Sequence, residues 1–305
     1  MSVDPAIVTP AGPWTHRMVA ANGGRFHVAL TGPDDPRAPL VVLLHGFPQF
    51  WWSWRHQLVA LGQAGYRCAA MDLRGYGASD KPPRAFAMPY LVADVAGVIR
   101  SLGSHSATVV GLGLGGQVAW ALPSLAPGAV RAIGVLGTPH PAFLFSPGHR
   151  AAPAGTLAKL GKFQIPWFPE RSITRGDLVA RLLHAWSGPG WQCEDTDLYT
   201  AAARLPFAAH SQMEQLRWLV RSQPRADGRR YRAQVCVPVR VPVLSLHGAA
   251  DGNLPPHSSR NDSTMTPGGY RRIVVDDVGH FLPEEAPEQV TSALLTWLGE
   301  PSRRR

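Results

Sequence analysis

Features that would place the chain in several other protein classes are missing from its 305 residues. No apolar run reaches the roughly 18 residues that a membrane-spanning helix needs. The polar, proline-containing start MSVDPAIVTPAGPW lacks the apolar segment of a signal peptide. We therefore expect a cytoplasmic protein, with attachment to the inner face of a membrane as an open alternative.

Cysteine is scarce and irregularly placed. Cys68, Cys193 and Cys236 are odd in number and far apart in the chain. This spacing fits neither a disulfide framework nor a set of metal ligands. The three thiols are predicted to be buried, apolar-like side chains, and we expect neither a metal nor a cofactor.

Charge is unevenly distributed along the chain, whose net charge is +9. No Asp or Glu lies between Asp94 and Glu170, whereas arginines gather later: Arg217, Arg221, Arg225, Arg229, Arg230, Arg232, Arg240 and the terminal Arg303, Arg304 and Arg305. Such a surface is either simply solvated or attracts phosphates, anionic lipid headgroups or an acidic partner. Stacking aromatics are not interleaved with the arginines, so nucleic-acid binding is not expected.

Short apolar strands alternate with helix-length segments over the first 140 residues. Continuous apolar runs, typical of buried parallel strands, occur at 39–46, 66–75, 107–113 and 130–139, and the pattern resumes at 241–252 and 271–281. The intervening segment reads as helices broken by Pro and Gly. We predict an α/β fold with a mostly parallel sheet flanked by helices, a core formed by 1–140 and 238–305, and an inserted helical lid at 141–237.

The stretch ATVVGLGLGGQVAW (107–120) has two interpretations. Gly111, Gly113 and Gly116 match a dinucleotide-binding turn, but such a turn needs an acidic residue about 20 positions later, and none is present. In the second interpretation the stretch is a strand-to-helix elbow with Gly113 at the nucleophile position. The acid and the histidine that must follow in chain order are then Asp251 and His280.

Several motifs together resemble the epoxide-hydrolase-like branch of the α/β-hydrolase superfamily. They are HGFPQFWWSWRHQL (45–58), DLRGYGASDKP (72–82), the elbow, FQIPWFPE (163–170), LHGAADGNLPP (246–256) and VGHFLPEEAPE (278–288). The resemblance covers nearly the whole chain. It implies the α/β-hydrolase fold with a lid, an oxyanion hole made by the backbone N–H groups of Phe47 and Leu114, and a histidine oriented by an acid.

The chain departs from this family at the residues that perform its chemistry. The family carries Asp or Ser at the elbow, whereas Gly113 offers neither a carboxylate nor a hydroxyl to form an ester. The lid tyrosines that assist epoxide opening are also absent: no Tyr lies between Tyr90 and Tyr199, and Leu216 precedes the lid arginine. Tyr199 and Tyr231 are expected to be packing or surface residues.

These departures predict a pseudoenzyme that binds an apolar ligand or a protein partner. A membrane-associated partner is an open alternative. Phe47 and the following residues are predicted to line the ligand pocket: Trp51, Trp52, Trp54, Phe143, Trp167, Trp186 and Leu216. The alternative is an active hydrolase in which His280, oriented by Asp251, activates water to attack an epoxide or ester. Asp72, Ser79, Asp80 and Thr138 are weaker candidate nucleophiles.

Overall fold

The computed structural model of the chain describes residues 3–144 and 154–300. Its centre is an eight-stranded sheet with the strand order β1-β2-β4-β3-β5-β6-β7-β8. The strands are β1 (Thr15–Ala21), β2 (Gly24–Thr31), β3 (Leu40–Leu44), β4 (Arg67–Met71), β5 (Ala107–Leu112), β6 (Val130–Leu136), β7 (Val243–Gly248) and β8 (Tyr270–Val275). From β4 to β8 all neighbours pair in parallel, whereas β2 runs antiparallel to β1 and β4. The predicted mostly parallel sheet is confirmed.

The antiparallel hairpin of β1 and β2 was not expected from the sequence. Its two turn residues, Asn22 and Gly23, both have positive φ, at 45° and 74°. An Asn-Gly pair is the preferred sequence for this tight hairpin turn, because both residues tolerate the left-handed backbone. The signal was therefore present, but the alternation of polar and apolar residues around it is weaker than the apolar runs of the central strands.

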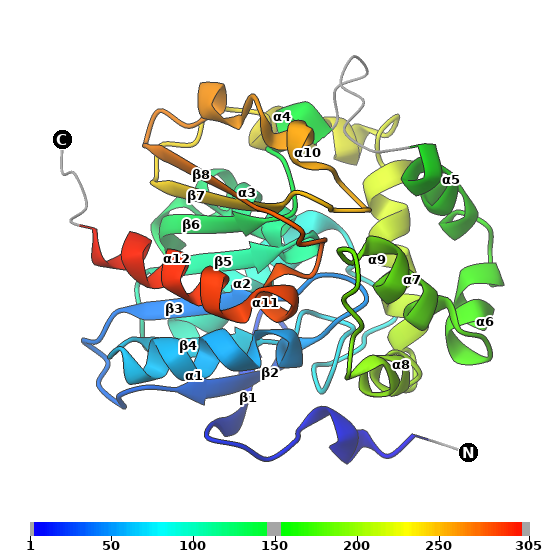
Figure 1. Cartoon of the computed structure of the whole chain (residues 1–305), viewed down its shortest axis with the longest axis horizontal. Helices are drawn as coiled ribbons and strands as arrows, with labels where there is room; N and C mark the ends of the chain where they lie inside the picture. Colours follow the sequence, from blue (N-terminus) through cyan, green and yellow to red (C-terminus); the bar gives the residue numbers. More distant parts are fainter. Residues whose placement is uncertain (1–2, 145–153, 301–305) are drawn as a thin grey trace.

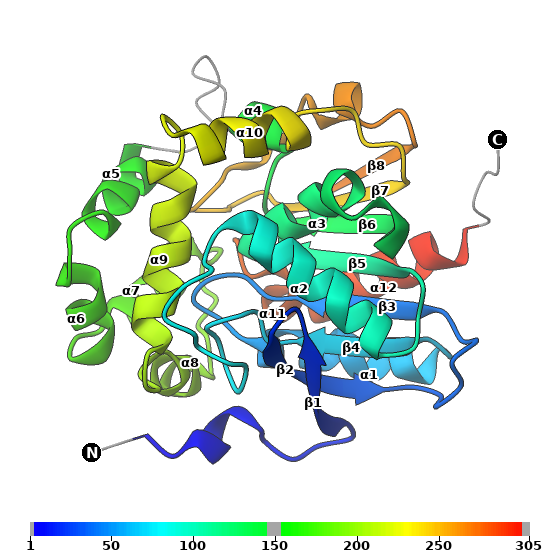
Figure 2. The same cartoon turned by 180° about the vertical axis from the view of Figure 1, so that it is seen from behind.

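Helices cover both faces of the sheet (Figures 1 and 2). On one face α1 (Arg55–Gln63) packs beside α12 (Pro287–Gly299), with the short α11 (Leu282–Glu285) next to them. On the other face lie α2 (Met88–Ser101) and α3 (Leu114–Leu125). All five residues of β3 are fully buried between these layers. The apolar runs of the central strands follow from this burial on both faces.

A helical insertion separates β6 from β7 in the chain. Its helices are α4 (Pro141–Leu144), α5 (Ala154–Phe163), α6 (Phe168–Thr174), α7 (Leu178–Trp186), α8 (Thr196–Ala203), α9 (Ala208–Arg221) and α10 (Ala226–Val235). Helices α5 to α9 form a layer at one end of the sheet (Figure 1). The predicted helical lid is thus present, while its division from the core at residues 141 and 237 stays a prediction. Within the described residues, no helix is both long and apolar enough to cross a bilayer.

Candidate active site

The elbow lies where β5 meets α3. Gly113 stands between them with φ 51° and ψ −109°, a conformation that glycine adopts without strain. Its N–H donates to the carbonyl oxygen of Leu136 at 2.9 Å, and its carbonyl oxygen accepts from the N–H of Gln117 at 3.0 Å. The sharp turn is therefore fixed on one side by β6 and on the other by α3.

Asp251 and His280, predicted from their order in the sequence, are brought together by the loops after β7 and β8. The two side chains are buried, and Nδ1 of His280 lies 2.8 Å from Oδ2 of Asp251. The second carboxylate oxygen, Oδ1, accepts from the backbone N–H groups of Asn253 and Leu254 at 2.8 and 2.9 Å. The acid is thus held by its own loop, and it fixes the orientation of the imidazole.

His280 also faces the elbow. A Cβ atom placed on Gly113 would lie 3.0 Å from Nε2 of His280 and 3.9 Å from Cα of Gly46. A carbon atom this close to the imidazole is tighter than ordinary van der Waals contact, so the ring already occupies part of the space beside the elbow. Gly113, Asp251 and His280, which are far apart in the sequence, therefore lie together at one site.

The predicted oxyanion donors lie on the two segments that meet at this site. Leu114 is the first residue of α3, so its N–H has no partner within the helix. Phe47 is buried in the loop after β3 and directly follows Gly46, which is in contact distance of the elbow. Stabilisation by these two N–H groups of negative charge beside Gly113 stays a prediction.

Three of the predicted pocket residues lie on the helical insertion, and one of them is close to His280. Trp186, at the end of α7, is buried with its ring centroid 5.6 Å from that of His280 and 6.4 Å from that of Phe47. Leu216 is buried on α9. Phe143, on α4, lies with its ring centroid 6.3 Å from that of His140.

The remaining tryptophans correct the pocket prediction. Trp51 is fully buried, donates to the carbonyl oxygen of Val8 and packs against Trp14, so it belongs to the contact with the N-terminal segment. Trp167 is 83% exposed and lines no enclosed pocket. Trp52 donates to a carboxylate of the insertion and Trp54 is fully buried, and for these two a place in the pocket stays a prediction. A tryptophan-rich sequence gives side-chain size but not direction, which explains the error.

A buried polar network next to the site was not predicted. The carboxylate of Glu284, on α11, accepts from Arg55 and from the side-chain amide of Gln49. Arg55 also pairs with Asp195 of the insertion at 3.0 Å. Burial raises the pKa of Glu284 to about 7, although Arg55 opposes this shift. Burial likewise raises the pKa of Tyr199, with the nearby charge of Glu284 adding to the effect.

The neighbouring acid, Glu285, holds the histidine loop. One carboxylate oxygen accepts from the N–H groups of Gly188 and Gly279 at 2.8 and 2.7 Å, and the other from Phe281 at 2.8 Å. In addition, the N–H of His280 donates to the carbonyl oxygen of Trp186 at 2.8 Å. The chain after α7 and the loop that carries the histidine are therefore fastened to each other. Adjacent acids at the start of a short helix were the only sequence signal for this role.

The weaker nucleophile candidates have structural partners. Asp72 accepts from the N–H groups of Trp51 and Ala78 and contacts His27 at 2.9 Å. Burial alone would raise the pKa of Asp72, but these bonds, led by that of His27, lower it overall. Ser79 donates to the carbonyl oxygen of the same aspartate.

Thr138 and Asp80 also have partners. The Thr138 hydroxyl accepts from Gln117 at 2.5 Å, and Asp80 accepts from the N–H of Arg25 at 2.8 Å. All four candidates thus have hydrogen-bond partners within the protein, and their part as weaker nucleophiles stays an untested prediction.

Other sequence predictions have mixed outcomes. Tyr199 and Tyr231 are buried packing residues, as expected. Cys68 is buried, but Cys193 and Cys236 are only partly so, and the prediction is wrong for these two. Both nevertheless pack against the hydrophobic core.

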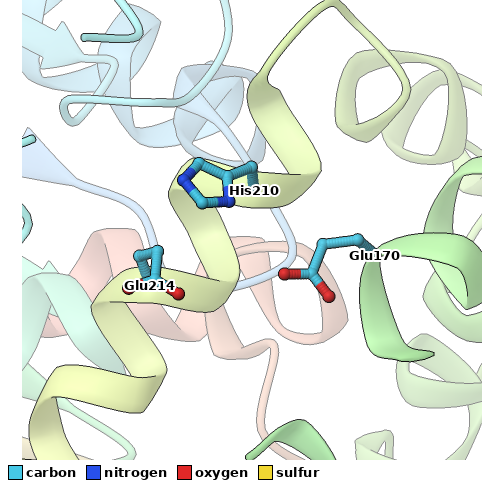
Figure 3. Close-up of side chains that lie close together, drawn as sticks. All are labelled: Glu170, His210 and Glu214. Carbon is cyan, nitrogen blue, oxygen red and sulfur yellow. The ribbon is translucent and has the colours of Figure 1, made fainter. Parts of the chain in front are cut away.

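Arg217 does not belong to the exposed basic surface. Its side chain is 5% exposed and pairs with Glu170 and Glu214. These two acids and His210 lie together where α6 meets α9 (Figure 3), with potential ligand atoms within 4.8 Å of one another. However, the guanidinium donates to both carboxylates, at 2.9 Å to Glu214. The positive charge that two carboxylates attract is thus supplied by the protein itself, and the cluster joins the two helices.

Comparisons with known proteins agree with this geometry. Residues 39–287 match the family model of the alpha/beta hydrolase fold. AB hydrolase superfamily protein YfhM of Bacillus subtilis (strain 168) is 31% identical, covering 92% of this chain and 97% of the relative. Epoxide hydrolase A of Mycobacterium tuberculosis is 30% identical over 93% and 97% of the two chains. A solved epoxide hydrolase from an endophytic Streptomyces is 29% identical, with a TM-score of 0.78 over 94% and 96% of the chains. The chain therefore belongs to the α/β-hydrolase family, in its epoxide-hydrolase-like branch.

Proposed function

We propose that this epoxide-hydrolase-like chain has lost the covalent reaction route and acts by binding a ligand or a partner. The observation that carries the proposal is Gly113, half-buried at the elbow with its Cβ position facing Nε2 of His280. A covalent hydrolase needs a carboxylate or hydroxyl at that position to form an ester with the substrate. Glycine has no side-chain atom that can form such a bond.

An apolar small molecule is one candidate for what is bound. The aromatic rings of Phe47 and Trp186 lie next to His280, and Phe163 of α5 packs edge-on to Phe47 at 6.1 Å between centroids. These side chains give the site apolar walls. The polar groups that remain at its base, the imidazole and the helix N-terminus, favour a ligand that carries a hydrogen-bond acceptor at one end.

A protein partner is the other candidate, and a basic surface groove supports it. The groove has a volume of about 300 Å³ and is lined by Ala85, Phe86, Ala87, Tyr90, Glu214, Arg217, Trp218, Arg221 and Arg225. Arg221 and Arg225 are exposed, and aromatic side chains lie beside them. Exposed arginines and aromatics are enriched in protein interfaces. This groove fits an acidic peptide segment.

Residual hydrolysis is the alternative function, because the pair of Asp251 and His280 is intact at 2.8 Å. In that route Nε2 of His280 accepts a proton from water, and the resulting hydroxide attacks an epoxide carbon or an ester carbonyl. The N–H groups of Phe47 and Leu114 then stabilise the oxygen that gains negative charge. Without a nucleophile at the elbow, such catalysis is slower by orders of magnitude.

Hydrolysis of a panel of epoxides and p-nitrophenyl esters by the purified chain tests the two functions against each other. We expect no turnover above that of the buffer, and no difference between the wild type and His280→Ala. Turnover that is present in the wild type and lost in His280→Ala would contradict the binding function and establish the water route. Co-elution of candidate acidic partners in size-exclusion chromatography, weakened by Arg221→Glu, tests the protein partner.

A further inference from the structure

The turn between α5 and α6 presents apolar side chains to solvent. Three of the four residues from Ile165 to Phe168, called the IPWF turn below, are strongly exposed: Ile165 at 49%, Trp167 at 83% and Phe168 at 53%. Single exposed apolar residues are common on soluble proteins, but a run of large ones on one turn indicates an interaction surface. The turn lies at the outer edge of the insertion, on the side away from the sheet (Figures 1 and 2).

The IPWF turn is held in place from beneath. The buried guanidinium of Arg217 donates to the carbonyl oxygens of Phe163 and Ile165 at 2.9 and 3.0 Å. Arg221 donates to the carbonyl oxygen of Gln164 at 2.5 Å. The exposed rings are thus carried on a backbone that hydrogen bonds fix, so ordering them costs little when they bind.

Trp167 also has a strained backbone. Its φ is 59°, in the left-handed region, which a non-glycine residue adopts only with backbone strain. Its side chain is largely in solvent, so packing within the chain does not offset this strain. A strained backbone that directs a large aromatic ring outward is typical of a residue that acts on something outside the protein.

Positive charge surrounds the turn. Lys162, Arg171 and Arg175 are exposed on its flanks. Between residues 159 and 175 the only acid is Glu170, which is paired with Arg217. The exposed charged residues of this segment are therefore all basic, and the next acid along the chain, Asp177, is paired with Arg181. The chain as a whole has a net charge of +9.

We propose that the IPWF turn inserts into the headgroup region of an anionic lipid bilayer. Trp and Phe favour the membrane interface, and each basic residue near an anionic surface adds to the electrostatic attraction. A protein interface generally needs about 800 Å² on each partner, whereas interfacial insertion needs only a few aromatic side chains. The small size of the apolar patch and its basic border therefore fit a lipid surface. This attachment does not depend on the reaction at the elbow.

Sedimentation of the full-length chain with lipid vesicles tests the proposal. The vesicles contain either phosphatidylcholine alone or phosphatidylcholine with phosphatidylglycerol. We expect binding to the anionic vesicles, weakened by added salt, and little binding to the neutral ones. The double variant Trp167→Ser/Phe168→Ser should bind the anionic vesicles about tenfold more weakly or worse, since it removes both inserted rings.

Two further variants make the test specific. Lys162→Glu/Arg171→Glu keeps the apolar turn and reverses its border, and it should also reduce binding to anionic vesicles. Met18→Ser removes a side chain that is 47% exposed on β1, at the edge of the sheet, and should bind as the wild type does. Thermal unfolding checks that each variant is folded.

Three results would overturn the assignment: no sedimentation of the wild type with anionic vesicles, unchanged binding of both double variants, or equal binding to neutral and anionic vesicles. If the serine variant does not fold, the charge-reversal variant, which alters only exposed side chains, decides the question. Binding that survives both variants would assign the attraction to another basic part of the chain.

Discussion

Three helices of the described chain begin after a residue with positive φ: α3 after Gly113, α6 after Trp167 and α9 after Phe207. Gly113 and Trp167 are opposite in kind. At the elbow, α3 begins after Gly113, with φ 51°, next to His280. In the insertion, α6 begins after Trp167, with φ 59°, in solvent. At the elbow a residue without a side chain relieves the strain, whereas on the outer surface the strain is kept together with a large ring. The comparison teaches that, at these helix starts, backbone strain accompanies an exposed aromatic side chain and not the elbow.

The largest expected effect comes from restoring a carboxylate at the elbow. Gly113→Asp should raise epoxide hydrolysis about 100-fold or more over the wild type, because its neighbours already include an oriented histidine and backbone N–H donors. The imidazole must move slightly, since a Cβ at this position lies 3.0 Å from Nε2 of His280. Turnover on an epoxide panel measures the effect. The double variant Gly113→Asp/His280→Ala should accumulate a covalent ester, seen as added mass, and an inactive, unmodified Gly113→Asp would show that more than the nucleophile is missing.

The second largest effect is expected on the free energy of unfolding, when a side chain is added at the elbow. Gly113→Ala should lower the free energy of unfolding by about 1–3 kcal/mol, since it adds backbone strain and crowds the imidazole. Gly128→Ala is the control, because a Cβ there meets nothing within 4 Å. Denaturant unfolding compares the two. Equal stabilities would mean that the elbow is relaxed enough to accept any residue.

The buried acid Glu284, in the polar network next to the elbow site, should make the stability of the protein depend on pH. The pKa of Glu284 is raised by burial to about 7 from an ordinary value of 4.5. An acid with a raised folded-state pKa contributes stability below its unfolded pKa, and this contribution is lost as the pH rises towards 7. Glu284→Gln should therefore gain stability relative to the wild type between about pH 4.5 and 7. Thermal unfolding across this pH range measures the gain, with the exposed Glu288→Gln as control. If the stabilities of the wild type and Glu284→Gln change with pH in the same way, the raised pKa of Glu284 is contradicted.

The smallest effect is expected at the exposed turn. Trp167→Gly removes the left-handed strain but gives the unfolded chain more freedom, so its stability should stay within about 1 kcal/mol of the wild type, on the stabilised side. Trp186→Gly, which empties a buried site beside the histidine, should be strongly destabilising by comparison. A clear loss of stability in Trp167→Gly would mean that the ring packs on the protein after all.

Much of the fold follows from the sequence, because central parallel strands are buried on both faces and read as continuous apolar runs. The hairpin of β1 and β2 was missed because β1 is mostly exposed and neither strand has the continuous apolar run of the central strands. The elbow, Asp251 and His280 were predicted because their order in the chain reflects the order of strands in the sheet. The contact between Arg55 and Glu284 spans 229 positions, and no local pattern marks it. The pocket was partly wrong, since the periodicity of HGFPQFWWSW does not tell which face each Trp takes.

The fastening of residues 186–188 to the histidine loop has a consequence for motion. Glu285 binds the N–H of Gly188, and His280 binds the carbonyl oxygen of Trp186. Next to them Gly279 has no room for a Cβ, which would lie 2.3 Å from the nitrogen of Gly188. The end of α7 is thus tied to the histidine loop at several points, and the indole of Trp186 is held beside the imidazole by the same contacts. Any movement of the insertion that kept these contacts would turn about residues 186–188.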